Sequence, residues 1–150
     1  MAQLHLQLVT PERTLLDEQV DSVSLATTDG IITILPHHAA LVASLVSGEM
    51  ITKVAGKYSS LHVSGGFVQV DKGGDVRVLA DAAEHDFEID LARAEKAKVD
   101  AEIALREQTF SDEEYAITAT QLQRSLSRIH IAKKRGHRRT RITSEGNLQQ

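Results

Sequence analysis

The chain has 150 residues, of which 41% are apolar and 25% are charged, and it contains neither Cys nor Trp. These values are typical of one small folded domain, or of a small domain with an appendage. The absence of Cys excludes disulfides, thiolate nucleophiles and Cys-based metal sites. No segment approaches the roughly 20 apolar residues of a membrane span, so we expect no direct membrane insertion.

The first part of the chain has the pattern of short β-strands. Leu4, Leu6 and Leu8 alternate with polar residues, which is the period of a half-buried strand. Similar short segments follow at residues 23–25, 31–35, 50–54, 61–63, 67–70 and 76–79. Turn-forming residues such as Gly65-Gly66 separate them. This pattern predicts an antiparallel β-sandwich, which we place at residues 1–86.

The pattern changes to that of helices at about Asp86, and neither Gly nor Pro occurs from residue 90 to residue 135. Asp90 is a predicted N-cap, and Ser111 with Glu114 forms a predicted capping box after a break at residues 108–110. Apolar residues recur at helical spacing in each half: Leu91, Ala94, Ala101 and Leu105, then Tyr115, Ala119, Leu122, Leu126 and Ile129. We therefore expect a helical hairpin at residues 87–135, and an α+β fold in which it follows the sandwich.

The seam of this hairpin is rich in Ala, so it buries little apolar area and lends modest stability. The hairpin is thus a candidate for an element that opens. Residues 136–150 contain few apolar side chains, which predicts a basic and disordered tail.

Charge is segregated along the chain. Residues 1–84 carry 5 basic and 10 acidic side chains, residues 85–114 carry 4 and 10, and residues 115–150 carry 8 and 1. The net charges are therefore −5, −6 and +7. A basic end of this kind indicates a negatively charged partner.

Catalytic and metal-binding patterns are not found. His37 and His38 are adjacent, so on a strand they would point to opposite faces and could not act as paired ligands. Gly56-Lys57 lacks the other residues of a phosphate-binding loop. We predict that the chain is not an enzyme, has no metal site and requires no cofactor.

One group of side chains suits a polyphosphate. Asp90 and Arg93 would share a helix face, as would Arg124 and Arg128. In an antiparallel hairpin the start of the first helix lies near the end of the second, so three guanidiniums could converge there. A helix cap with surface ion pairs is the simpler explanation of the same residues.

The order of motifs resembles that of the epsilon subunits of rotary ATP synthases. Residues 35–41 (LPHHAAL) resemble a family segment Leu-Pro-Gly-His-Ala-Pro-Leu, and residues 65–70 (GGFVQV) resemble Gly-Gly-Phe-Val-Glu-Val. Residues 78–84 (VLADAAE) resemble the strand that closes the family's sandwich. Residues 89–94 (IDLARA) match the motif that opens the first C-terminal helix. The resemblance runs from about residue 3 to residue 134.

This resemblance implies a non-catalytic rotor subunit. It implies that the sandwich contacts the gamma subunit and the ring of c subunits and helps to couple proton flow to rotation. It implies that the helices can extend toward the alpha and beta catalytic subunits and inhibit ATP hydrolysis. The residues implied for those inhibitory contacts are Arg124, Arg128, Lys133, Lys134 and Arg135. The implied location is peripheral, at the cytoplasmic face of a bacterial plasma membrane, with a thylakoid membrane as the less favoured setting.

Some members of the family bind ATP on the folded hairpin, and the matching residues here are Glu84, Asp90, Arg93, Arg124 and Arg128. Asp100 stands where strong ATP binders carry Arg, so the expected binding is weak and regulatory. His37, Ala40 and Ile31 also depart from the family pattern in the region implied to contact the c ring.

Two other functions are weighed against this one. A nucleic-acid-binding module would use the basic residues 133–141, but no aromatic residue follows Tyr115 to stack on bases, so no nucleic acid is expected. A stand-alone ATP sensor would bind ATP tightly in isolation, which Asp100 disfavours.

Overall fold

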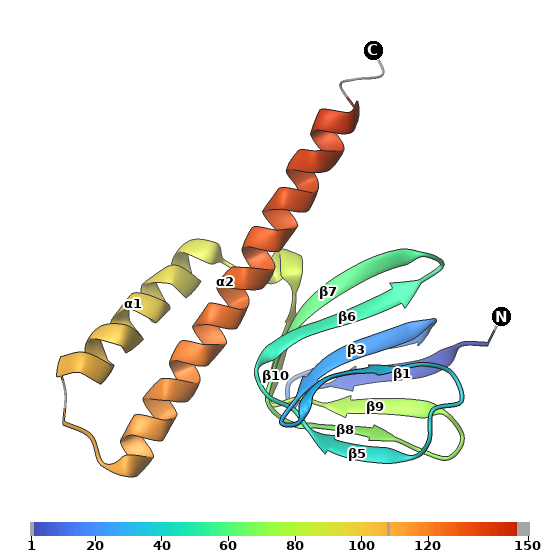
Figure 1. Cartoon of the computed structure of the whole chain (residues 1–150), viewed down its shortest axis with the longest axis horizontal. Helices are drawn as coiled ribbons and strands as arrows, with labels where there is room; N and C mark the ends of the chain where they lie inside the picture. Colours follow the sequence, from blue (N-terminus) through green and yellow to red (C-terminus); the bar gives the residue numbers. More distant parts are fainter. Residues whose placement is uncertain (1, 108, 147–150) are drawn as a thin grey trace. The chain divides into compact units, whose positions relative to one another are not determined.

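The computed structural model describes residues 2–107 and 109–146, with side chains described as far as Gly136. It consists of two compact units, Met1–His85 and Asp86–Gln150. The sequence placed this boundary one residue later, after residue 86. Figure 1 shows the strands and helices that make up these units.

The first unit is a sandwich whose described residues form ten strands in two five-stranded sheets. One sheet has the order β2-β1-β9-β8-β5, with bounds Thr14–Val20, Leu4–Val9, Asp75–Leu79, Phe67–Val70 and Leu41–Ser44. The other has the order β10-β7-β6-β3-β4, with bounds Ala82–His85, Lys57–Ser64, Gly48–Val54, Ser22–Thr27 and Gly30–Ile34. The predicted β-sandwich is therefore confirmed.

The core lies between the two sheets and follows from the alternation in the sequence. Leu4, Leu6 and Leu8 of β1 are at most 1% exposed, and the residues between them are half-buried. Val23 and Leu25 of β3 face the same core from the other sheet. With so few aromatic residues, this interior consists of branched aliphatic side chains and Met50.

Two edge strands and one pairing differ from the sequence prediction. The strands β2 and β5 form the edges of their sheet, and neither was predicted. An edge strand has only one neighbour and tolerates charged residues such as Asp17 and Glu18, so its apolar alternation is weak. The pairing of β1 with β9 is parallel, although the other strand pairings are antiparallel.

Two turns of the sandwich contain glycine at positions where the backbone has positive φ. Ala55 and Gly56 both have positive φ, of 51° and 79°, and form the two-residue turn between β6 and β7. Gly66 has a φ of 105°, and a Cβ there would overlap the carbonyl oxygen of Leu79. The Gly-Gly pair before β8 is thus fixed by close backbone approach as well as by conformation.

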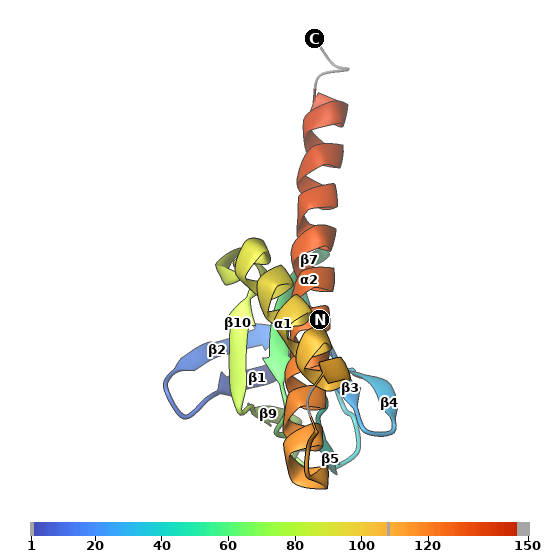
Figure 2. The same ribbon diagram turned by 90° about the vertical axis from the view of Figure 1, so that its left-hand side faces the viewer.

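The second unit contains the short 3₁₀ helix η1 (Asp86–Glu88) and the helices α1 (Leu91–Glu107) and α2 (Asp112–Gly146). In both views α1 lies alongside α2, which gives the predicted hairpin (Figures 1 and 2). The helix α2 continues to Gly146, whereas the sequence predicted an end at Arg135 and a disordered tail. A single Gly costs a helix only about 1 kcal/mol, and no Pro follows Gly136 to stop it. Residues 147–150 of that predicted tail lie outside the described residues.

Candidate functional site

Two side-chain caps define where the helices of the hairpin begin. The carboxylate of Asp90 accepts a hydrogen bond from the backbone N–H of Arg93 at 3.1 Å. The Ser111 hydroxyl accepts from the N–H of Glu114 at 3.3 Å, and the Glu114 carboxylate accepts from the N–H of Ser111 at 3.0 Å. Both predicted caps are therefore present, and they satisfy amide groups that a helix start leaves unpaired.

The hairpin buries small side chains and leaves several large apolar ones exposed. Ala94 and Ala101 of α1 are buried, as are Ser125, Ile129 and Ile131 of α2. The larger apolar side chains that stay at least 40% exposed are Val99, Ile103, Tyr115, Ile117 and Leu126. The predicted stripe of α2 is thus wrong at Tyr115 and Leu126. Apart from Ile129 and Ile131 the buried side chains are small, so closing this seam removes a modest apolar area from water.

A cleft of about 430 Å³ lies between the two helices. Its lining from α1 includes Ala97, Asp100 and Ala101, and its lining from α2 includes Arg124 and Arg128. Two guanidiniums and one carboxylate therefore share the cleft. Its size and basic side chains suit an anion, whereas Asp100 opposes one by like-charge repulsion.

Of the residues predicted to bind ATP, Arg124 and Arg128 share one cleft of the helical unit. Arg124 and Arg128 line the cleft, while Arg93 lies on the exposed first turn of α1 next to the Asp90 cap. Glu84 belongs to the sandwich unit, where its carboxylate lies 3.5 Å from Nδ1 of the buried His62. The predicted role of these residues in ATP binding stays a prediction.

The residues predicted to inhibit hydrolysis lie along α2, and two of them contact earlier parts of the helical unit. Lys133 Nζ lies 3.9 Å from Glu95 Oε1. The Arg135 guanidinium carbon lies 6.0 Å from the centre of the Phe87 ring. Sequence reasoning identified the basic residues but missed Glu95 and Phe87. The signal available was the antiparallel offset, which places the start of α1 beside residues 129–135.

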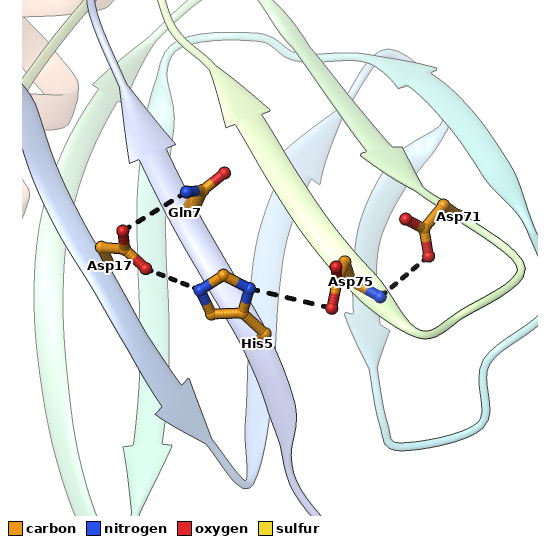
Figure 3. A network of polar contacts seen from close by, with 5 residues as sticks. All are labelled: His5, Gln7, Asp17, Asp71 and Asp75. Atoms are coloured by element: carbon orange, nitrogen blue, oxygen red, sulfur yellow. Dashed lines mark hydrogen bonds and ion pairs between the residues drawn. The ribbon is translucent and has the colours of Figure 1, made fainter.

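A second polar group lies on the sandwich, where three strands carry interacting side chains (Figure 3). His5 Nε2 on β1 lies 2.6 Å from Asp17 Oδ1 on β2, and His5 Nδ1 lies 3.7 Å from Asp75 on β9. Gln7 donates a hydrogen bond to the other oxygen of Asp17 at 3.3 Å. The hydrogen bonds from His5 and Gln7 lower the pKa of Asp17 below its ordinary value. This exposed network joins three strands on the outer face of the sheet.

No group of three or more His, Asp or Glu side chains in residues 2–107 and 109–136 is placed to hold a metal ion. No helix in that part of the chain is long and apolar enough to cross a membrane.

Comparison with known families matches both units separately. Residues 3–86 match the family described as "ATP synthase, Delta/Epsilon chain, beta-sandwich domain". Residues 88–133 match the family described as "ATP synthase, Delta/Epsilon chain, long alpha-helix domain". Together these matches cover most of the chain and meet at the same boundary as the two structural units.

Individual relatives of the chain are ATP synthase epsilon chains as well. The chain is 42% identical over 135 residues to an ATP synthase epsilon chain of Dehalococcoides mccartyi, covering 90% of this chain and 96% of the relative. It is 38% identical over 135 residues to an ATP synthase epsilon chain of Ruminococcus albus, covering 90% and 100%.

Solved structures show the same architecture. A chain in the mitochondrial ATP synthase of Euglena gracilis, in an assembly described as OSCP/F1/c-ring, superimposes with a TM-score of 0.75 at 25% identity, covering 85% of this chain and 79% of that one. A chain in the central stalk and c-ring of the Tetrahymena thermophila mitochondrial ATP synthase has a TM-score of 0.67 at 12% identity, covering 86% and 96%, and supports the fold alone.

Proposed function

Because this chain belongs to the ATP synthase delta/epsilon chain family, we propose that it is a central-stalk subunit that helps to couple proton translocation to ATP synthesis and whose C-terminal helices inhibit ATP hydrolysis. The related epsilon chains are stalk subunits rather than catalytic ones. The chain is therefore part of a membrane-associated complex without itself being the enzyme. The two structural units carry the two halves of the proposal.

The sandwich is the anchor in this proposal. Its core is aliphatic and closely packed, with Leu6, Leu8 and Val78 fully buried, so it can transmit torque without deforming. Several apolar side chains remain exposed on it, including Ile31 at 80% and Val42 at 69%. Exposed apolar residues of this kind suit contact with another protein. The partners proposed for the sandwich are the gamma subunit and the c-subunit ring.

The helical unit is the brake, and one observation carries this part of the proposal. From Tyr115 to Ser144 the chain contains no acidic residue, and the basic residues 124–135 lie on one continuous helix. Such a helix suits an acidic surface, which we propose is on the alpha and beta catalytic subunits. The modest apolar area of the hairpin seam would let α2 separate from α1 and reach that surface.

ATP is proposed as a weak regulator rather than a required cofactor. Arg124 and Arg128 in the cleft between the helices favour a polyphosphate, and binding there would favour the closed hairpin. Asp100 in the same cleft reduces the affinity. For the complex as a whole, we propose a peripheral position at the cytoplasmic face of a bacterial plasma membrane.

The test is ATP hydrolysis by the matching catalytic complex after removal of this subunit. The full chain is added back in parallel with a chain that ends at Glu88, which keeps the whole sandwich unit and lacks both long helices. We expect both chains to bind and only the full chain to suppress hydrolysis. A charge-reversal variant of Lys133 and Arg135 to Glu should bind through its sandwich and lose the suppression.

The alternatives are separated by the same experiment. If both chains bind and neither suppresses hydrolysis, the proposed coupling role stands and the proposed inhibition by the C-terminal helices is wrong. If neither binds, the assignment itself fails. Binding of duplex DNA that falls steeply with salt would then favour a nucleic-acid partner for the basic residues 133–141.

A further inference from the structure

The basic part of α2, which we propose inhibits hydrolysis, contacts the start of its own hairpin. Arg135 lies over the ring of Phe87 in η1, and Lys133 lies within ion-pair distance of Glu95 in α1. A cation above an aromatic ring within about 6 Å is attracted by the negative face of the ring. Two residues proposed to contact the catalytic subunits are therefore occupied when the hairpin is closed.

These contacts lie at the open end of the hairpin. The other end is closed by the covalent link between α1 and α2, so separation must begin where Phe87 and Glu95 are. A small cleft of about 180 Å³ at this end is lined by Asp86, Ile89, Leu91, Ala132, Arg135 and Gly136. Arg135 of α2 thus reaches Phe87 in the segment that precedes α1.

The rest of the seam is weak enough for such contacts to matter. The buried residues of its two helices are the small Ala94, Ala101 and Ser125, together with Ile129 and Ile131. Losing an exposed cation–π contact changes the ratio of two states about two- to fivefold, and losing an exposed ion pair changes it about 1.4- to fivefold. Where the two states of a hairpin differ by only a few kcal/mol, contacts of this size change their ratio several-fold.

In the closed hairpin, acidic residues of the chain itself take the place of the acidic surface that we propose as the target of α2. Residues 85–114 carry a net charge of −6 and residues 115–150 a net charge of +7, and the two segments meet at the pairs Lys133–Glu95 and Arg135–Phe87. An acidic surface elsewhere must compete with this internal acidic partner. We propose that Phe87 and Glu95 form a latch that holds Arg135 and Lys133 away from the catalytic subunits until the hairpin opens. The latch itself is a property of the isolated chain. Only its effect on ATP hydrolysis rests on the proposed inhibitory function.

The test measures hairpin opening in the full-length chain. Since the chain contains no Cys, spin labels can be placed at Lys96→Cys on α1 and Gln123→Cys on α2, both exposed positions. Pulsed electron spin resonance then gives the populations of short and long distances. Phe87→Leu keeps the apolar bulk and removes the aromatic face, and Glu95→Gln removes the charge. Phe87→Leu should raise the open-to-closed ratio about two- to fivefold, and Glu95→Gln about 1.4- to fivefold.

Matched controls separate the latch from general effects. Phe87→Tyr keeps the aromatic face and should behave as the wild type. Tyr58→Leu removes a similar exposed aromatic residue from the sandwich, where Lys53 Nζ lies 5.5 Å from its ring centre. Glu107→Gln removes a carboxylate from the far end of α1. None of the three should change the distance distribution.

Hydrolysis by the catalytic complex is measured with the same variants. If Phe87→Leu and Glu95→Gln leave the distances unchanged, the latch is wrong whatever happens to hydrolysis. If they open the hairpin and inhibit at a concentration lower by the same factor, the latch and the brake both stand. If they open the hairpin while neither they nor the wild type slows hydrolysis, the latch stands and the proposed inhibition fails.

Discussion

Replacing Ala94 with Leu should force the hairpin open while leaving both helices intact. Ala94 is fully buried, and Ala101 lies seven residues later on the same face of α1 and lines the cleft against α2. Leu adds three carbons at a position with no exposed surface. The helix itself tolerates the change, because Leu and Ala are both strong helix formers.

The magnitude follows from the cost of overpacking. Inserting methylene groups into a filled site costs about 1–3 kcal/mol, and in a hairpin that can open this cost falls on the closed state alone. A penalty of that size raises the open-to-closed ratio about 5- to 150-fold. The effect should therefore exceed that of either latch substitution, because Ala94 lies in the seam itself.

The assay is the distance distribution between the labels at positions 96 and 123, with circular dichroism to confirm that helix content is unchanged. The control is Ala92→Leu, the same substitution two residues earlier at an exposed position of the same helix. It should match the wild type. If Ala94→Leu gives the same short distances as Ala92→Leu, the seam accommodates the larger side chain and the argument from small buried residues fails.

Further predictions concern the cap, a turn and the histidine network. Ser111→Ala should destabilise the helical unit by about 1 kcal/mol, because it removes the hydroxyl that accepts from the Glu114 amide, and amide hydrogen exchange in the first turn of α2 should quicken accordingly. Gly66→Ala should cost the sandwich at least about 1–3 kcal/mol in urea unfolding, and clearly more than Gly74→Ala, since both have positive φ but only Gly66 would overlap a backbone carbonyl. The pKa of Asp17 is lowered from its ordinary 3.8 by hydrogen bonds from His5 and Gln7, so its contribution to stability is present above about pH 4 and is lost as the pH falls through the folded-state value. Asp17→Asn should therefore lower the melting temperature at neutral pH, and the difference from the wild type should shrink as the pH is lowered toward about 2. An equal difference at both pH values would contradict this account.

Much of the fold follows from local patterns in the sequence. The alternation of Leu4, Leu6 and Leu8 determines which face of β1 is buried, because successive side chains on a strand point in opposite directions. Asp90 and Ser111 mark the helix starts because their side chains satisfy amides within three residues. These features depend on neighbours along the chain and can be predicted without knowing the tertiary structure.

Other features depend on segments that are distant in sequence. Strand β1 pairs in parallel with β9, and no local pattern indicates that partner. Ser125 is buried and Leu126 is 45% exposed, although apolarity alone predicts the reverse. The closeness of the two helices selects small side chains for the seam, and this selection exists only once α1 and α2 are packed together.

In the candidate site, too, some features follow from the sequence and others only from the tertiary structure. The composition of the sequence identifies the basic residues 124–135 as a surface for an acidic partner, since charge is a property of each side chain. Only the packed hairpin shows that Lys133 meets Glu95 and that Arg135 meets Phe87. Contacts between residues nearly forty or fifty positions apart are set by the offset of two antiparallel helices. That offset is decided by how the whole seam packs, and no local segment of the sequence specifies it.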